Sequence, residues 1–293
     1  MANPHHHDDE LHDHDRGLAF DLDTLMARRG VLKLFAGGAL VGVGATALAA
    51  CGGGGSTATS TAAPGTTAAA GTTTAATATT VAATDTPTAI PEETAGPYPG
   101  DGSNGVNVLS QSGIVRSDIR SSFGSATGVA EGVPLDIELT VLDTANGGAP
   151  MAGAAVYVWH CSREGEYSLY SENATNENYL RGVQETDASG KVTFQSIFPA
   201  AYPGRWPHIH FQVYPDVNEA IAAGTETATS QIALPEDTSK LVYAEAGYEQ
   251  SVTNLSQTSL ATDMVFGDGW DAELGTVTGT VTDGLKVALD VPV

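Results

Sequence analysis

Two histidines separated by one residue are the clearest candidates for chemistry in this sequence. His208 and His210 lie in residues 207–213, which read Pro-His-Ile-His-Phe-Gln-Val. On a β-strand, both imidazoles would project from one face, while Ile209, Phe211 and Val213 would anchor the strand in a core from the other. A rigid imidazole pair can bind a metal ion, but two hydrogen-bonded polar side chains would give the same pattern. Taken alone, the pair leaves both interpretations open.

Two tyrosines precede this histidine pair. Tyr202 lies six residues before His208, in the Phe-Pro-Ala-Ala-Tyr-Pro of residues 198–203, and Tyr167 follows Gly165 at the end of residues 159–167. Each could be a half-buried aromatic side chain whose hydroxyl meets a partner. The chain has nine tyrosines, so neither is informative by itself. What matters is the order in which tyrosines and histidines occur.

Several short motifs accompany these residues between about Thr94 and Gln231. In chain order they are Thr94-Ala95-Gly96-Pro97-Tyr98, Gly153-Ala154-Ala155-Val156-Tyr157-Val158-Trp159, Gly165-x-Tyr167, Arg181-Gly182, Thr186-Asp187-Ala188-Ser189-Gly190, Pro199-x-x-Tyr202 and His208-x-His210. This order resembles the intradiol ring-cleavage dioxygenases, the family that includes catechol 1,2- and protocatechuate 3,4-dioxygenases. The resemblance covers most of the part of the chain that is expected to fold.

The resemblance implies one non-haem ferric ion per chain, bound by Tyr167, Tyr202, His208 and His210. These ligand types suit iron(III). A free phenol has a pKa of about 10 and is neutral at pH 7, whereas a trivalent cation at bonding distance stabilises the phenolate. Two phenolates and a hydroxide would balance the charge of the ion. Zinc would fit less well, because its sites favour Cys, His and carboxylate ligands.

The resemblance also implies an enzyme that uses dioxygen to open a catechol-type ring between its two hydroxylated carbons, giving a muconate-type diacid. Tyr202 is then the ligand that leaves on substrate binding and helps to take a proton. Arg205 would stabilise the developing carbanion, although Trp206-Pro207 departs from the family spacing and a surface cation is the alternative. Gln231 matches a Ser/Thr-Gln motif that lies beside the oxygen pocket in the family. The stretch between His210 and Gln231 is longer here than in the well-known family members.

The elements that must position these residues are expected to be β-strands. Leu135, Ile137, Leu139 and Val141 alternate with polar residues, and residues 154–159, 191–198, 275–282 and 285–291 are further candidate strands. The last two flank Asp283-Gly284, which predicts a hairpin. No stretch shows helical periodicity over three turns, and residues 219–224 predict a short turn of helix at most. We therefore predict an all-β fold, a sandwich of two sheets.

The N-terminal part of the chain predicts export and lipid anchoring. Arg28-Arg29 resembles a twin-arginine signal, and the apolar residues 34–50 end in Leu-Ala-Ala before Cys51, as at a bacterial lipoprotein cleavage site. We predict a signal region at 1–50, a flexible Gly/Ser/Thr/Ala tether at 51–90 and a β-sandwich catalytic domain at 91–293. With Cys51 lipidated, the protein would sit on the outer face of the cytoplasmic membrane, or outside the cell after release, and Cys161 would have no disulfide partner.

Charge and motif content restrict the other possibilities. A formal net charge of -23 argues against nucleic-acid binding and against any membrane contact beyond the lipid anchor. The expected partners are a catechol-type small molecule and dioxygen, and a homo-oligomer is left open. A transthyretin-like or carboxypeptidase-regulatory-like binding module shares several of the motifs but gives no reason for the histidine pair beside both tyrosines. A cupin site would need a Glu where Tyr214 and Pro215 stand.

Overall fold

Alternating side chains build the first long strand. In the computed structural model, which describes residues 86–293, strand β1 spans Pro134–Asp143. Leu135, Ile137, Leu139 and Val141 are all buried, as the period of two requires when one face of a strand covers a core. The strand predicted from this alternation is confirmed.

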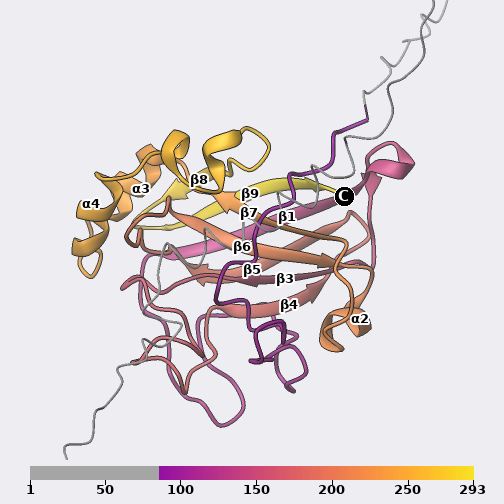
Figure 1. The fold of residues 1–293 in the computed structure, drawn as a ribbon, viewed down its shortest axis with the longest axis horizontal. Helices are drawn as coiled ribbons and strands as arrows, with labels where there is room; N and C mark the ends of the chain where they lie inside the picture. The colour runs from indigo at the N-terminus through magenta and orange to yellow at the C-terminus, as the bar shows by residue number, and fades with distance from the viewer. Residues whose placement is uncertain (1–85) are drawn as a thin grey trace, which may run out of the picture. The chain divides into compact units, whose positions relative to one another are not determined.

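The described residues form two β-sheets with short helices at their ends (Figure 1). Besides β1, the strands and α-helices are β2 (Ala149–Pro150), β3 (Ala155–Trp159), β4 (Arg181–Glu185), β5 (Lys191–Ile197), β6 (His208–Tyr214), α2 (Val217–Ile221), β7 (Ala228–Ala233), α3 (Glu236–Val242), α4 (Glu249–Leu255), β8 (Thr276–Thr280) and β9 (Gly284–Pro292). Single turns of 3-10 helix lie at Thr144–Asn146, Leu260–Thr262 and Phe266–Asp268. The fold is thus mostly β, as predicted.

The two sheets differ in how their strands pair. One has the order β2-β1-β9-β8, with β5 pairing with β1, and the other has the order β4-β3-β6-β7. The second sheet is antiparallel throughout, whereas β1 and β9 run parallel. β8 and β9 form the hairpin predicted around Asp283-Gly284, with Thr280 opposite Gly284. A positive φ of 101° at Gly284 explains why glycine occupies that position.

Strand β6 is buried on both faces. Ile209, Phe211 and Val213 pack in the core between the two sheets. The opposite face of the same sheet is covered by a second apolar cluster, which includes Tyr157, Trp159 and residues of the loops that precede β1 and follow β3. The polar side chains of β6 on this second face are therefore removed from water, and their energetics depend on their neighbours.

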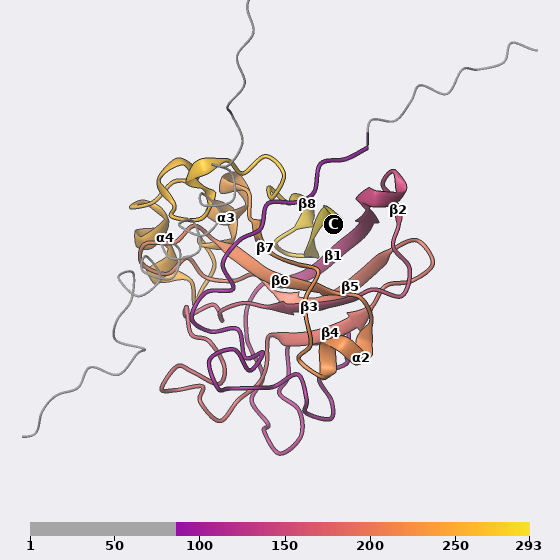
Figure 2. The ribbon, with the colours of Figure 1, turned by 45° about the vertical axis from the view of Figure 1, so that its right-hand side comes forward.

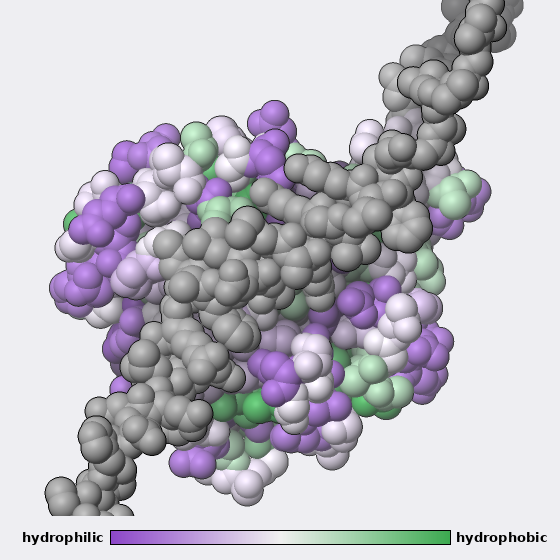
Figure 3. All heavy atoms as spheres, in the orientation of Figure 1, coloured by the Kyte–Doolittle hydropathy of each residue, from purple (hydrophilic) through white to green (hydrophobic). Residues whose placement is uncertain are grey.

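The helices at one end of the sandwich are where the sequence-based prediction was wrong. The prediction of no helix beyond a short turn near 219–224 is matched by α2, but α3 and α4 were missed. Each has seven residues, about two turns, which is too short to display a 3.6-residue period. They are held instead by packing of Val242 and Leu255 on the core. Both helices lie at the same end of the sheets, and α2 lies at the other (Figures 1 and 2). Hydrophilic residues gather at the surface over α3 and α4 (Figure 3).

Several sequence-based predictions concern residues outside the described range. The twin-arginine motif, Cys51 and nearly all of the tether lie within residues 1–85. In residues 86–293, no helix has the length and apolar character that crossing a membrane requires. Cys161 is a buried free thiol, and burial raises its pKa to about 12.

One carboxyl group is buried without full compensation. Glu273 is fully buried, its Oε1 accepts a hydrogen bond of 3.2 Å from Ser230, and its Oε2 has no partner in the described part of the chain. Burial, followed by the negative charge of Glu93, raises the pKa of Glu273 to about 8. The native state therefore keeps this proton over a pH range in which the unfolded state has already lost it.

We expect a Glu273→Gln variant to change the pH dependence of folding stability. From about pH 4.5 to pH 8 the unfolded chain binds fewer protons at this position than the native chain, so native stability falls as pH rises. At ~1.4 kcal/mol per pKa unit, the cost is on the order of 3–5 kcal/mol above pH 8. In urea unfolding, the metal-free variant should have a larger free energy of unfolding than the metal-free wild type at pH 9 and an equal one at pH 4. An equal gain for Glu172→Gln, at an exposed position, would attribute the effect to net charge instead.

Candidate metal centre and active site

Strand β6 places the two predicted histidines side by side. The Nε2 atoms of His208 and His210 are 3.1 Å apart, and both side chains are buried. Trp159, opposite His210 on β3, stacks on its imidazole with ring centroids 4.9 Å apart and an interplanar angle of 5°. Metal–nitrogen bonds are about 2.0–2.1 Å long, so both Nε2 atoms can reach one ion.

Burial keeps both imidazoles neutral. Desolvation, and then the charge of Arg205, holds the pKa of His208 well below its usual range. Desolvation and the neighbouring His208 do the same for His210. The Nδ1 atom of His208 lies 2.5 Å from the carbonyl oxygen of Trp206, which can only accept, so Nδ1 carries the proton and Nε2 presents its lone pair. This is the protonation state that a metal ligand requires.

Both predicted tyrosines lie against the histidine pair. The hydroxyl of Tyr202 is 3.1 Å from Nε2 of His208. The ring of Tyr167 meets those of Tyr202 and His210 edge-on, at centroid distances of 6.0 and 6.3 Å. Tyr167 is buried to 2% exposure, whereas Tyr202 is only partly buried. The two phenols therefore differ in access from outside.

The hydroxyl of Tyr167 is the most informative atom of the site. It is buried and has no hydrogen-bond partner of acceptable geometry among residues 86–293. Burial, followed by the adjacent phenol of Tyr202, raises its pKa well above the usual value. An unpaired buried hydroxyl costs about 1–3 kcal/mol, so this position is unfavourable unless another group engages the oxygen.

A buried arginine fixes the segment that follows Tyr167. Arg181, on β4, donates from Nε to the Ser168 hydroxyl at 3.0 Å and from Nη2 to the Ser168 carbonyl at 2.9 Å. Its Nη1 donates to the carbonyl of Pro99 and to the hydroxyl of Tyr157, at 2.9 and 3.1 Å. One side chain thus ties the residue after Tyr167 to the segment containing Tyr98, whose ring lies 4.9 Å from that of Tyr167.

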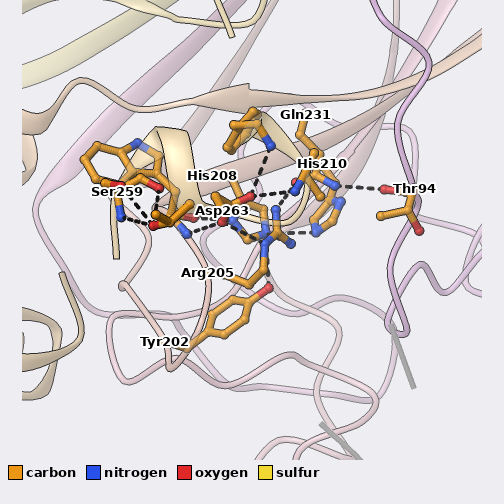
Figure 4. Close-up of polar contacts among 12 residues, drawn as sticks. Thr94, Tyr202, Arg205, His208, His210, Gln231, Ser259 and Asp263 are labelled. Atoms are coloured by element: carbon orange, nitrogen blue, oxygen red, sulfur yellow. Dashed lines mark hydrogen bonds and ion pairs between the residues drawn. The ribbon is translucent and has the colours of Figure 1, made fainter. Parts of the chain in front are cut away.

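Arg205 is enclosed in the site and is not a surface cation. It is 3% exposed, and its Nη1 lies 3.4 Å from Nε2 of His208. Its Nη2 donates to Oε1 of Gln231 at 2.7 Å, and its Nε pairs with Oδ2 of Asp263 at 3.1 Å. Figure 4 shows Gln231 and Asp263 approaching the guanidinium from different sides, with Tyr202 below it.

The long connection between His210 and Gln231 does not separate them. It contains α2, and β6 and β7 pair so that His210 is opposite Gln231. The amide of Gln231 is oriented by a 2.9 Å hydrogen bond from Nε2 to the carbonyl oxygen of Thr94. The Thr94–Tyr98 motif thus crosses the site, and a Cβ added at Gly96 would lie 3.3 Å from the imidazole of His210. The close approach explains the need for glycine there.

The donor set fits a trivalent ion better than a zinc-type one. Among residues 86–293, no group of three or more His, Cys, Asp and Glu side chains could hold a metal ion. A metal in this place would therefore depend on the phenols as well as the imidazoles. The unpartnered hydroxyl of Tyr167 and the neutral imidazoles of the two histidines are the features expected of such a site.

Sequence reasoning missed three contributors to the site. Asp263 lies between two single turns of 3-10 helix in a segment with no recognised motif. Thr94 acts through a backbone carbonyl, which carries no sequence signal. Trp159 was noted as part of a motif, but its stacking on His210 follows only from strand pairing.

The third histidine of the described range, His160, lies outside the cluster and bonds to the Cys161 carbonyl and the Ser196 hydroxyl.

Part of the chain is similar in sequence to known dioxygenases. Residues 120–221 match a family model described as Dioxygenase. The catechol 1,2-dioxygenase of Candida albicans is 34% identical over 77 residues, which are 26% of this chain and 25% of that protein. The hydroxyquinol 1,2-dioxygenase of a Rhizobium species is 28% identical over 152 residues, covering 44% of this chain and 48% of that protein. The matches thus span less than half of these curated relatives.

Solved structures give a wider correspondence. An intradiol ring-cleavage dioxygenase from Tetranychus urticae superposes with a TM-score of 0.55 at 26% identity. The alignment covers 70% of this chain and 94% of that one. The shared fold therefore extends beyond the segment that matches the family model.

Proposed function

We propose that this chain is a distant member of the intradiol ring-cleavage dioxygenase family, that it holds one ferric ion and that it opens catechol-type rings with dioxygen. Tyr167, Tyr202, His208 and His210 would be the ligands, and a muconate-type diacid would be the product. The observation that carries the proposal is the buried, unpartnered hydroxyl of Tyr167 beside two imidazole nitrogens 3.1 Å apart. Bound iron(III) would supply Lewis acidity, drawing electron density from a chelated catechol ring.

The two phenols are suited to different tasks. Tyr167 is enclosed on all sides and held through Arg181, so it is the fixed ligand. Tyr202 is partly accessible and its hydroxyl is 3.1 Å from His208, so it would be the exchangeable ligand. As a phenolate, Tyr202 would accept a proton from a substrate hydroxyl.

The remaining side chains would stabilise charge and exclude water. Arg205 directs Nη1 toward Nε2 of His208, where it would stabilise negative charge that develops on a bound substrate. Gln231 holds that guanidinium from β7, and Trp159 fixes the ring of His210. The enclosure by apolar and aromatic side chains strengthens each of these electrostatic interactions, because water is kept out.

The proposal is tested on the purified full chain by metal analysis, visible absorption and oxygen uptake. We expect one iron per chain, a visible tyrosinate–iron band, and uptake of one dioxygen per ring opened with catechol, protocatechuate or hydroxyquinol. Oxygen uptake without a muconate-type product would contradict intradiol cleavage. A colourless, metal-free protein without uptake would instead indicate a non-catalytic β-sandwich module.

Export and lipid anchoring remain part of the proposal and rest on sequence alone. Arg28-Arg29 and Cys51 suggest an enzyme anchored outside the cytoplasmic membrane. A route that exports folded proteins would suit a site whose ligands come from distant parts of the fold. The preferred catechol would then be one that reaches the protein from outside the cell.

A further inference from the structure

Asp263 lies on a segment that neither the motifs nor the matched family region includes. It follows α4 and stands between the 3-10 turns Leu260–Thr262 and Phe266–Asp268. Its side chain is fully buried, with 0% exposure. Its backbone is also fixed, because its N–H donates to the carbonyl of Ser259 at 2.9 Å (Figure 4).

Both carboxylate oxygens of Asp263 are fully engaged. Oδ1 accepts the backbone N–H groups of Val265 and Phe266 at 2.9 and 3.2 Å. Oδ2 accepts the backbone N–H of Trp206 at 2.6 Å and Nε of Arg205 at 3.1 Å. A carboxylate held by four donors cannot rotate without losing several of them, so it is a rigid reference point.

The direction of the Arg205 guanidinium follows from two such anchors. Asp263 accepts a hydrogen bond from Nε, and Gln231 accepts one from Nη2 at 2.7 Å. The amide of Gln231 is itself oriented by the carbonyl of Thr94. Nη1 is left as the nitrogen directed at Nε2 of His208, 3.4 Å away. Because the guanidinium is planar, two fixed nitrogens determine where the third points.

We propose that Asp263 is a positioning residue for the reaction, acting through Arg205. It holds the guanidinium with Nη1 toward the reacting atoms and supplies the negative charge that permits burial of the cation. The segment from α3 to Leu274 is then part of the catalytic unit and more than a cover for the sandwich. This inference rests on the proposed dioxygenase function.

The test is a double-mutant cycle between Asp263→Asn and Arg205→Ala in the iron-loaded full chain. Removing one oriented donor from an active site lowers kcat by about 10²–10³-fold, so we expect misdirecting Arg205 through Asp263→Asn to cost about 10–100-fold. KM, iron content and the visible band should stay unchanged, because Asp263 touches neither substrate nor ligand. In the Arg205→Ala background, Asp263→Asn should cost nothing further.

Two variants separate positioning from simple structural support. Asp216 accepts two backbone N–H groups at the start of α2, as Oδ1 of Asp263 does in its own turn. No arginine of residues 86–293 forms an ion pair with Asp216. Asp216→Asn should therefore leave kcat unchanged. Asp263→Glu keeps the charge and should recover part of the rate that Asp263→Asn loses. If Asp263→Asn does not fold, Asp263→Glu takes its place in the cycle. A fall in kcat of equal size with and without Arg205, or loss of the visible band, would overturn the inference.

Failure of the proposed function can be distinguished from failure of this inference. If the wild-type chain opens no ring, the function is wrong, and positioning can still be measured in the metal-free full chain by nuclear magnetic resonance. The Nε–H of Arg205 should exchange slowly with solvent in the wild type and rapidly in Asp263→Asn. The exposed pair of Arg120 and Asp118 provides the rapid reference. Equal protection in wild type and variant would show that Asp263 does not hold the guanidinium.

Discussion

A Tyr167→Phe variant is expected to lose the visible colour of the iron-loaded protein and its ring-opening activity. The change removes the proposed ligand oxygen but no carbon atom, so packing of the ring is unchanged. Loss of an outer-shell partner typically costs 10–100-fold in metal affinity or activity, and loss of a ligand should exceed that. Visible absorption, iron content and product formation are the measurements. Retained colour and rate would remove Tyr167 from the iron site.

The same variant should be more stable than the wild type when both are metal-free. The Tyr167 hydroxyl is buried without a partner, and its removal should stabilise the fold by about 1–3 kcal/mol. A gain of this size raises Tm by roughly 2–4 °C per kcal/mol for a domain of this length. Tyr170→Phe is the matched control, because that hydroxyl accepts from Gly100 and donates to Asn104. It should keep the colour and lose stability.

A His210→Gln variant is expected to lose iron to the same degree as the Tyr167→Phe variant. Glutamine keeps a polar side chain at this position of β6, but it has no imidazole lone pair and cannot reproduce the 5° stack on Trp159. Iron titration of the metal-free variant, followed by the visible band, measures the loss. Because β6 is buried on both faces, the substitution can also destabilise the fold. The thermal unfolding of the variant is therefore measured alongside the titration.

His160→Gln is the control for His210→Gln. His160 is equally buried, and desolvation lowers its pKa to about 4, but its ring bonds to Cys161 and Ser196, outside the ligand cluster. The His160 variant should bind iron with wild-type affinity, even if the fold is less stable. Equal iron loss in both variants would mean that burial of a histidine, not ligation, determines iron retention.

The elements that carry the site were predictable because their patterns are local. The period of two in β1 and the alternation of imidazoles with apolar residues in β6 follow directly from strand geometry. The resemblance of the ordered motifs to a known family linked Tyr167 and Tyr202 to the histidines. The structure brings all four side chains into one cluster, which no local pattern could have shown.

The parts that could not be predicted depend on distant packing. Asp263 lies far along the chain from Arg205, and its position follows from α3 and α4, which are too short to show a helical period. Burial of the β6 face that carries His208 and His210 depends on loops without regular structure. The role of Thr94 is that of a carbonyl oxygen, which every residue type supplies. In each case the missing information is which residues meet across the fold.

The parallel pairing of β1 with β9 also constrains how the protein can fold. β1 lies between β5 and β9, yet β9 is roughly 150 residues further along the chain. Contacts this remote in sequence are slow to form, because a long loop must be closed before they yield any stabilisation. During synthesis, the first sheet would keep an open edge until residues 284–292 leave the ribosome. This protein is therefore expected to acquire its core, and with it the proposed metal site, only after translation of β9.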